Sequence, residues 1–73
     1  MTYDPVANAA YVYLTDEPLP PGRDSIPCDP PEGMQAMVVM DWKEGRIVGL
    51  EVLDARQLLH SDFLESAEQP PGR

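Results

Sequence analysis

The chain has 73 residues, with 13 acidic and 5 basic side chains and a formal net charge of −8. This length predicts one small domain, near the size at which a single hydrophobic core is only marginally stabilising. The acidic balance argues against nucleic acid as a ligand, because phosphate binding depends on clustered Lys and Arg. It is compatible with binding a basic protein, although an acidic surface also serves solubility.

One cysteine and one histidine limit the chemistry of the chain. Cys28 has no partner for an internal disulfide, and Cys28 with His60 cannot supply a tetrahedral zinc site. We therefore expect neither a metal nor a cofactor. Self-association is the remaining way to stabilise so small a core, and we expect a homodimer.

The sequence contains no pattern typical of secretion or of a membrane span. Its N-terminus lacks a basic region followed by an apolar run, and no apolar stretch approaches the ~20 residues of a membrane helix. We expect a cytoplasmic protein without membrane contact.

The N-terminal part predicts a short extended segment, a turn and a strand. Asp4 precedes Pro5, and the residue before proline is disfavoured in helices, so this pair is typical of a turn. The segment 10–14, AYVYL, is rich in aromatic and aliphatic residues and predicts a strand. By alternation, we expect its aliphatic side chains to face the core.

The segment 16–33 holds six of the nine prolines and allows two interpretations. It is either a proline-rich linker or a loop followed by a short edge strand at 23–28. We prefer the second, since an edge strand tolerates Pro27 and is protected by it against unwanted pairing.

The segment 34–53, MQAMVVMDWKEGRIVGLEVL, predicts a central β-hairpin. Lys43 and Glu44 fit a type I turn, and Gly45 fits the following positive-φ position of a three-residue loop. This register places Val39 opposite Gly49.

Alternation along the hairpin separates its side chains into two faces. The apolar face, predicted to be the core, carries Ala36, Val38, Met40, Trp42, Val48, Leu50 and Val52. The mixed face, together with the tyrosines of segment 10–14, is the candidate interaction face and comprises Tyr11, Tyr13, Met37, Val39, Ile47, Gly49 and Glu51.

A helix start follows the hairpin. Asp54 fits an N-cap, Gln57 fits its capping-box partner, and Leu53 with Leu58 fits a hydrophobic staple. A second short helical turn follows, with Ser61 as its cap. Phe63 and Leu64 are expected to anchor this turn on the sheet. We place the domain at 1–68 and expect 69–73 to be a frayed tail.

Three parts of the sequence carry a resemblance to a known family. They are Tyr3-Asp4-Pro5, the strand 10–14, and the run from Gly45 to Ala55, GRIVGLEVLDA, with Asp41 before it. Together they resemble the small bacterial proteins grouped as domain of unknown function 2283, over nearly the whole chain. The resemblance implies an antiparallel sheet with C-terminal helical turns and implies no established activity.

No constellation of catalytic residues is evident. Asp41 and Glu51 share the mixed face, but the predicted register separates them by roughly 13 Å at ~3.3 Å per residue, too far for a paired acid–base site. Cys28 has no basic neighbour to activate it, and nothing at a fixed spacing marks His60 as a base. We therefore assign no catalytic residue.

These observations predict an α+β fold, a small antiparallel meander sheet of about four strands with one or two short C-terminal helices packed on it. Which face the helices cover stays open. The favoured function is a non-catalytic protein-interaction or self-associating module. The alternatives are an antitoxin-like partner that neutralises a small basic toxin and a small enzyme with Glu51 as its base.

Overall fold

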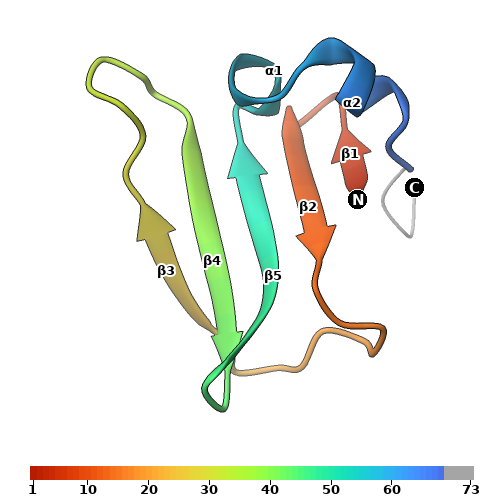
Figure 1. Cartoon of the computed structure of the whole chain (residues 1–73), viewed down its shortest axis with the longest axis vertical. Helices are drawn as coiled ribbons and strands as arrows, with labels where there is room; N and C mark the ends of the chain where they lie inside the picture. Colours follow the sequence, from red (N-terminus) through yellow and green to blue (C-terminus); the bar gives the residue numbers. More distant parts are fainter. Residues whose placement is uncertain (69–73) are drawn as a thin grey trace.

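The computed structural model of the protein describes residues 1–68, which form one five-stranded antiparallel sheet with two short helices at one end (Figure 1). The predicted α+β class is confirmed, with one strand more than the about four expected. The predicted tail 69–73 lies outside the described residues. The elements are β1 (Thr2–Asp4), β2 (Ala9–Tyr13), β3 (Asp24–Cys28), β4 (Met37–Lys43), β5 (Arg46–Leu53), α1 (Ala55–Leu58) and α2 (Ser61–Glu65).

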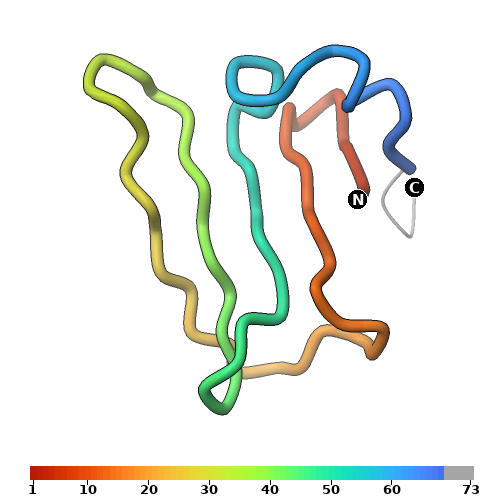
Figure 2. Tube along the Cα trace, in the orientation of Figure 1, coloured from red at the N-terminus to blue at the C-terminus, as the bar shows by residue number. Residues whose placement is uncertain are grey.

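The strand order is β1-β2-β5-β4-β3, with the hairpin strand β5 at the centre. The preferred interpretation of the proline-rich segment is correct, since β3 is an edge strand that pairs only with β4 and is exposed throughout. At the other edge, Thr2 forms a parallel bridge with Glu68, so the described chain ends beside its own beginning (Figure 2).

The hairpin turn differs from the prediction. Lys43 pairs directly with Arg46, and the two residues between them, Glu44 and Gly45, have φ values of 51° and 78°. Two consecutive positive φ angles define a two-residue type I′ turn, whose twist matches that of the flanking strands. The predicted three-residue loop was therefore wrong, because a non-glycine residue, Glu44, adopts a left-handed conformation.

The tighter turn and a β-bulge change the register of the hairpin. The pairing shifts between Asp41 and Trp42, so that Asp41 lies opposite Gly49 and Trp42 lies opposite Ile47, with Val48 as the extra residue. Val39 consequently pairs with Glu51, not with Gly49 as predicted.

Cross-strand pairs define one apolar face as a series of rows. The row nearest the helices is Ala10–Val52–Val38–Cys28, the middle row is Val12–Leu50–Met40–Ile26, and the row nearest the turn is Ile47–Trp42–Asp24. Ile47 therefore lies on the same face as its partner Trp42. The prediction that Ile47 belongs to the mixed face was wrong. The bulge causes this difference, because one extra residue reverses the alternation beyond it.

The helices cover only the row of the apolar face that lies nearest to them. Ala10, Val52 and Ala55 form the buried cluster, and half-buried leucines from the helical region pack against it: Leu58, Leu59 and Leu64. This places the helices on the apolar face. No large side chain within residues 1–68 is fully buried, so the core of the single chain is small.

Helix α1 begins where predicted, but its N-terminus is stabilised differently. Asp54 has a left-handed φ of 56° and makes no side-chain cap, so the predicted capping box with Gln57 is absent. Instead, Asn8 accepts the Ala55 N–H at its carbonyl oxygen (2.9 Å) and the Arg56 N–H at Oδ1 (3.0 Å). Its Nδ2 also donates to Asp54 Oδ1 at 2.6 Å.

Helix α2 also departs from the prediction in detail. Its N-cap is His60, not Ser61, and no side chain caps it. Phe63 is 51% exposed, whereas Leu64 packs on the core, so only Leu64 is an anchor. Neither of the two helices in the described chain is long and apolar enough to cross a membrane.

Candidate functional site

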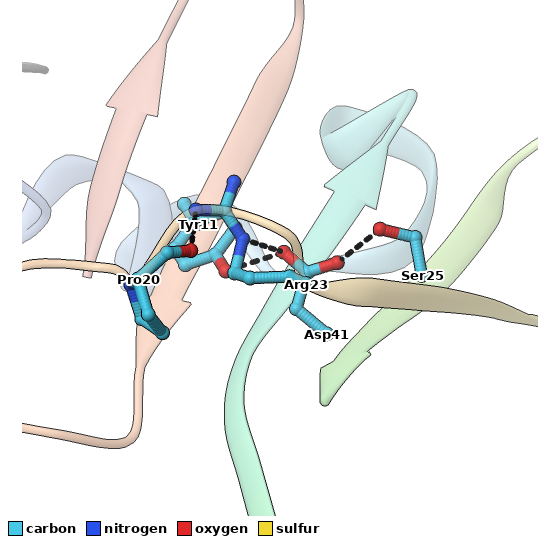
Figure 3. A network of polar contacts seen from close by, with 5 residues as sticks. All are labelled: Tyr11, Pro20, Arg23, Ser25 and Asp41. Carbon is cyan, nitrogen blue, oxygen red and sulfur yellow. Dashed lines mark hydrogen bonds and ion pairs between the residues drawn. The ribbon is translucent and has the colours of Figure 1, made fainter. Parts of the chain in front are cut away.

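The opposite face of the sheet contains a polar network centred on Asp41 (Figure 3). Asp41 lies on β4 and is 3% exposed. A carboxylate is rarely so buried unless other groups pair with it. The Tyr11 hydroxyl donates to Oδ2 at 2.6 Å, the Ser25 hydroxyl donates to Oδ1 at 2.7 Å, and Arg23 Nε lies 3.5 Å from Oδ2. Three elements thus converge on one buried carboxylate: β2, β3 and the loop before β3.

Gly49 makes the contact between Tyr11 and Asp41 geometrically feasible. Tyr11 lies on β2 and Asp41 on β4, with β5 between them, and Gly49 is the β5 residue paired with Asp41. A β-carbon at position 49 would lie 2.6 Å from Cζ of Tyr11, which is closer than real atoms approach. Glycine is therefore required for the close approach of the Tyr11 ring. The Tyr11 ring fills the space that the missing side chain of Gly49 leaves on this face.

Arg23 anchors the loop between β2 and β3 to the polar face. Its Nη1 donates to the Pro20 carbonyl oxygen at 2.9 Å, while its Nε faces Asp41 (Figure 3). One guanidinium therefore links the proline-rich loop to the sheet. In the ion pair between Arg23 and Asp41, the Asp41 carboxylate is nearly excluded from solvent. Salt therefore screens this ion pair less than one on the surface.

The network shifts the pKa values of its two central groups in opposite directions. Burial by itself would raise the pKa of Asp41, but hydrogen bonds from Tyr11 and Ser25 and the charge of Arg23 lower that pKa below its ordinary value. Burial, the hydrogen bond to Asp41 and the negative charge of Asp41 raise the pKa of Tyr11. At neutral pH the carboxylate stays ionised and the phenol protonated, so neither is suited to exchange a proton.

A cavity of about 330 Å³ adjoins the network on the polar face. Glu51 contributes to its wall, and the wall also includes Tyr11, Tyr13, Arg23, Asp4 and Leu19. The Asp4 carboxylate accepts the N–H groups of the turn that follows it, from Val6 at 3.0 Å and Ala7 at 3.3 Å.

The corrected register also changes the relation between Asp41 and Glu51. Asp41 pairs with Gly49 and Glu51 pairs with Val39, so the two acidic residues are diagonal neighbours, which typically lie about 7–8 Å apart. The predicted separation of roughly 13 Å was therefore too long. Within residues 1–68, Glu51 has no ion pair with either Arg46 or Arg56, the two partners considered for it.

The remaining sequence candidates lie outside the network. Met37 and Val39 are half-buried on the polar face, paired with Leu53 and Glu51. Tyr13 is 41% exposed, and its ring centroid is 4.9 Å from that of Tyr11.

Cys28 and His60 are both exposed. No group of three or more His, Cys, Asp or Glu side chains in the described chain is arranged to hold a metal ion.

Sequence reasoning missed Arg23 and Ser25 as members of the site. Ser25 is the β3 partner of Asp41, and Arg23 immediately precedes β3. The edge strand itself was predicted, but its register against β4 was not. With that register, the pairing of Ser25 with Asp41 would have identified the network.

The fold and the network define a small α+β domain in which one buried aspartate on β4 ties β2 and the edge strand β3 together across a single antiparallel sheet. The family model described as "Protein of unknown function (DUF2283)" matches residues 1–56, and the chain belongs to this family. The matched segment contains all five strands and the start of α1. No curated protein and no solved structure matches the chain.

Proposed function

We propose that this protein is a non-catalytic protein-interaction module that contacts another polypeptide through the part of its apolar sheet face that its own helices leave uncovered. The observation that carries this proposal is a contiguous apolar surface built from two cross-strand rows. We call it the open apolar surface, and it comprises Val12, Ile26, Met40, Trp42, Ile47 and Leu50.

The arrangement of the elements supports this proposal. The helices pack over the row that contains Ala10 and Val52, and in Figure 1 no described segment crosses the middle of β2, β5, β4 or β3. Ile26 is 49% exposed, and the other members of the open apolar surface are only half-buried. Contiguous exposed apolar patches mark sites of protein contact more often than single exposed residues do.

The chemistry of the polar face supports the non-catalytic part of the proposal. Both carboxylate oxygens of Asp41 accept hydrogen bonds, and its lowered pKa makes it a weak base. The Tyr11 proton is committed to the same carboxylate. A saturated network of this kind rigidifies the sheet, which is a structural role.

The cavity beside Glu51 favours a second candidate, a small enzyme or ligand-binding protein with Glu51 as its polar group. Glu51→Gln tests this candidate, since it keeps the size of the side chain and removes its charge. Loss of an activity or of small-ligand binding in this variant, with self-association unchanged, would favour the second candidate over the interaction module.

The experiment that tests the interaction module is affinity purification of the tagged chain from cell extract, read by native mass spectrometry. Two adjacent substitutions on β4 are compared, Met40→Lys on the open apolar surface and Val39→Lys on the polar face. We expect a fixed complex with the unmodified chain and with Val39→Lys, and loss of that complex with Met40→Lys. A chain that is monomeric and unaccompanied in every case would refute the proposal.

A further inference from the structure

We infer that the partner of the open apolar surface is a second copy of this chain, packed face to face so that two sheets enclose one shared core. This inference rests on the proposed function and specifies the partner. It also assigns the contact to the apolar face, whereas the sequence had favoured the face that carries Tyr11 and Gly49.

The accessible area of the chain is larger than its mass predicts. The chain exposes 5305 Å², whereas a monomeric protein of 8.1 kDa exposes about 4,500 Å² by the usual scaling of area with mass. The excess, about 800 Å², is close to the area that each partner contributes to a standard protein–protein interface. The chain is therefore less compact than a monomer of its mass, by an amount comparable to what one contact between two copies would bury.

Within residues 1–68, the apolar face of the sheet has only part of the second layer that a sheet requires. Domains bury the apolar face of a sheet against another layer, and here the helices supply that layer only at one end. The buried hydrophobic residues within 1–68 are three alanines and one valine: Ala10, Ala36, Ala55 and Val52. A second sheet, stacked at about 10 Å as in β-sandwiches, would cover the middle row and complete the core.

The distribution of charge favours a copy of this chain over a basic protein. The six residues of the open apolar surface are uncharged, and Asp24, at the edge of the row that contains Trp42, is the one acidic residue in the rows described. A surface that recognises a basic partner would present carboxylates at its centre. Two identical apolar surfaces are instead complementary to each other, as a two-fold interface requires, and Asp24 lies at the edge of the surface.

The first test uses the unmodified chain, because its only tryptophan, Trp42, lies within the open apolar surface. Sedimentation velocity over a dilution series should show a mass of about 16 kDa that falls to the 8.1 kDa of one chain. Trp42 emission should shift to longer wavelength over the same concentration range. A mass transition without any change in Trp42 emission would place the contact elsewhere and overturn the inference.

The second test compares substitutions on the two faces. Met40→Lys puts a charge in the middle row and should weaken dimerisation by at least about 100-fold, whereas Val39→Lys, one residue earlier on the other face, should leave it within a few-fold. Ile26→Lys, at an edge position that is 49% exposed, repeats the test with less risk to folding. Dimerisation lost in Val39→Lys and retained in Met40→Lys and Ile26→Lys would refute the assigned face.

Salt dependence separates this inference from the proposed function. Raising salt from about 0.05 to 0.5 M should tighten the dimer, because it screens repulsion between two chains of charge −8. A chain that stays monomeric at all salt concentrations, yet binds a basic polypeptide through Met40 with an affinity that salt weakens, would overturn the inference and leave the interaction module standing. A chain that binds nothing would overturn both.

Discussion

Tyr11 on β2 and Asp41 on β4 are hydrogen-bonded at 2.6 Å although strand β5 lies between them. Gly49 of β5 leaves the space through which the Tyr11 side chain passes. The contact joins residues 30 positions apart and ties three adjacent strands together on the polar face. It therefore stabilises the pairing of strands in a sheet whose opposite face is only partly covered.

Gly49→Ala is expected to lower the free energy of unfolding by about 2–4 kcal/mol, because its β-carbon would displace the Tyr11 ring and break the bond to Asp41. Urea denaturation measures the loss. In a Tyr11→Ala background the same substitution should cost much less, since the ring that it displaces is absent. Equal losses in the two backgrounds would show that Gly49 acts independently of Tyr11.

Stability should fall at acidic pH because of Asp41. Its pKa in the folded chain lies below the ordinary value of 3.8, so the unfolded chain binds the additional proton as pH falls. The contribution is fully present above about pH 4 and is lost below it as pH falls through the folded-state pKa. Denaturant titrations between pH 6 and pH 2 should show this loss, and Asp41→Asn should be less stable at pH 6 and less sensitive to acid.

Stability should also fall at alkaline pH because of Tyr11. Its pKa in the folded chain lies above the ordinary value of 10.0, so its contribution is present below pH 10 and is lost as pH rises further. Absorbance of the phenolate at high pH, together with thermal unfolding, reports the effect. Tyr11→Phe should reduce the loss of stability above pH 10. Tyr13→Phe should leave this loss unchanged, because no hydrogen bond from Tyr13 to Asp41 is present.

Glu44→Asn should raise the free energy of unfolding by about 0.5–1 kcal/mol. Glu44 has a φ of 51° in the type I′ turn, and asparagine followed by glycine is a preferred pair in such turns. Thermal unfolding compares this variant with Glu44→Val, which should be less stable than the original because β-branched residues are strained at positive φ. The opposite order of the two variants would argue against a type I′ turn.

Asn8→Ala should lower the free energy of unfolding by about 1–2 kcal/mol, because the Asn8 side chain accepts the Arg56 N–H and donates a hydrogen bond to the Asp54 carboxylate. Gln57→Ala is the matched control and should change stability by less than about 0.5 kcal/mol, since the side chain of Asp54 forms no cap with which Gln57 could cooperate. A larger loss of unfolding free energy for Gln57→Ala than for Asn8→Ala would instead support the predicted capping box between Asp54 and Gln57.

The features that the sequence predicted correctly depend on neighbouring residues. Alternation and side-chain shape in β2 and around the turn identified strands, the preferred interpretation of 23–28 as an edge strand that tolerates Pro27 was correct, and the residues after Leu53 identified the start of a helix. Family membership follows from the same local runs and is confirmed over residues 1–56. Each of these signals is contained within about ten residues, where backbone sterics and hydrophobic periodicity dominate.

The features that only the tertiary structure decided depend on residues distant in sequence. A left-handed Glu44 and a bulge at Val48 displaced the register by two residues, which brought Gly49 opposite Asp41. The cap of α1 comes from Asn8, 46 residues before its partner Asp54. Composition determined that this small acidic chain would have little core, but only the packing of α1 and α2 decided which face remains open. The physical reason is that strand register and the position of a bulge depend on pairing between residues far apart in sequence, and a shift of one residue moves every side chain beyond it to the other face.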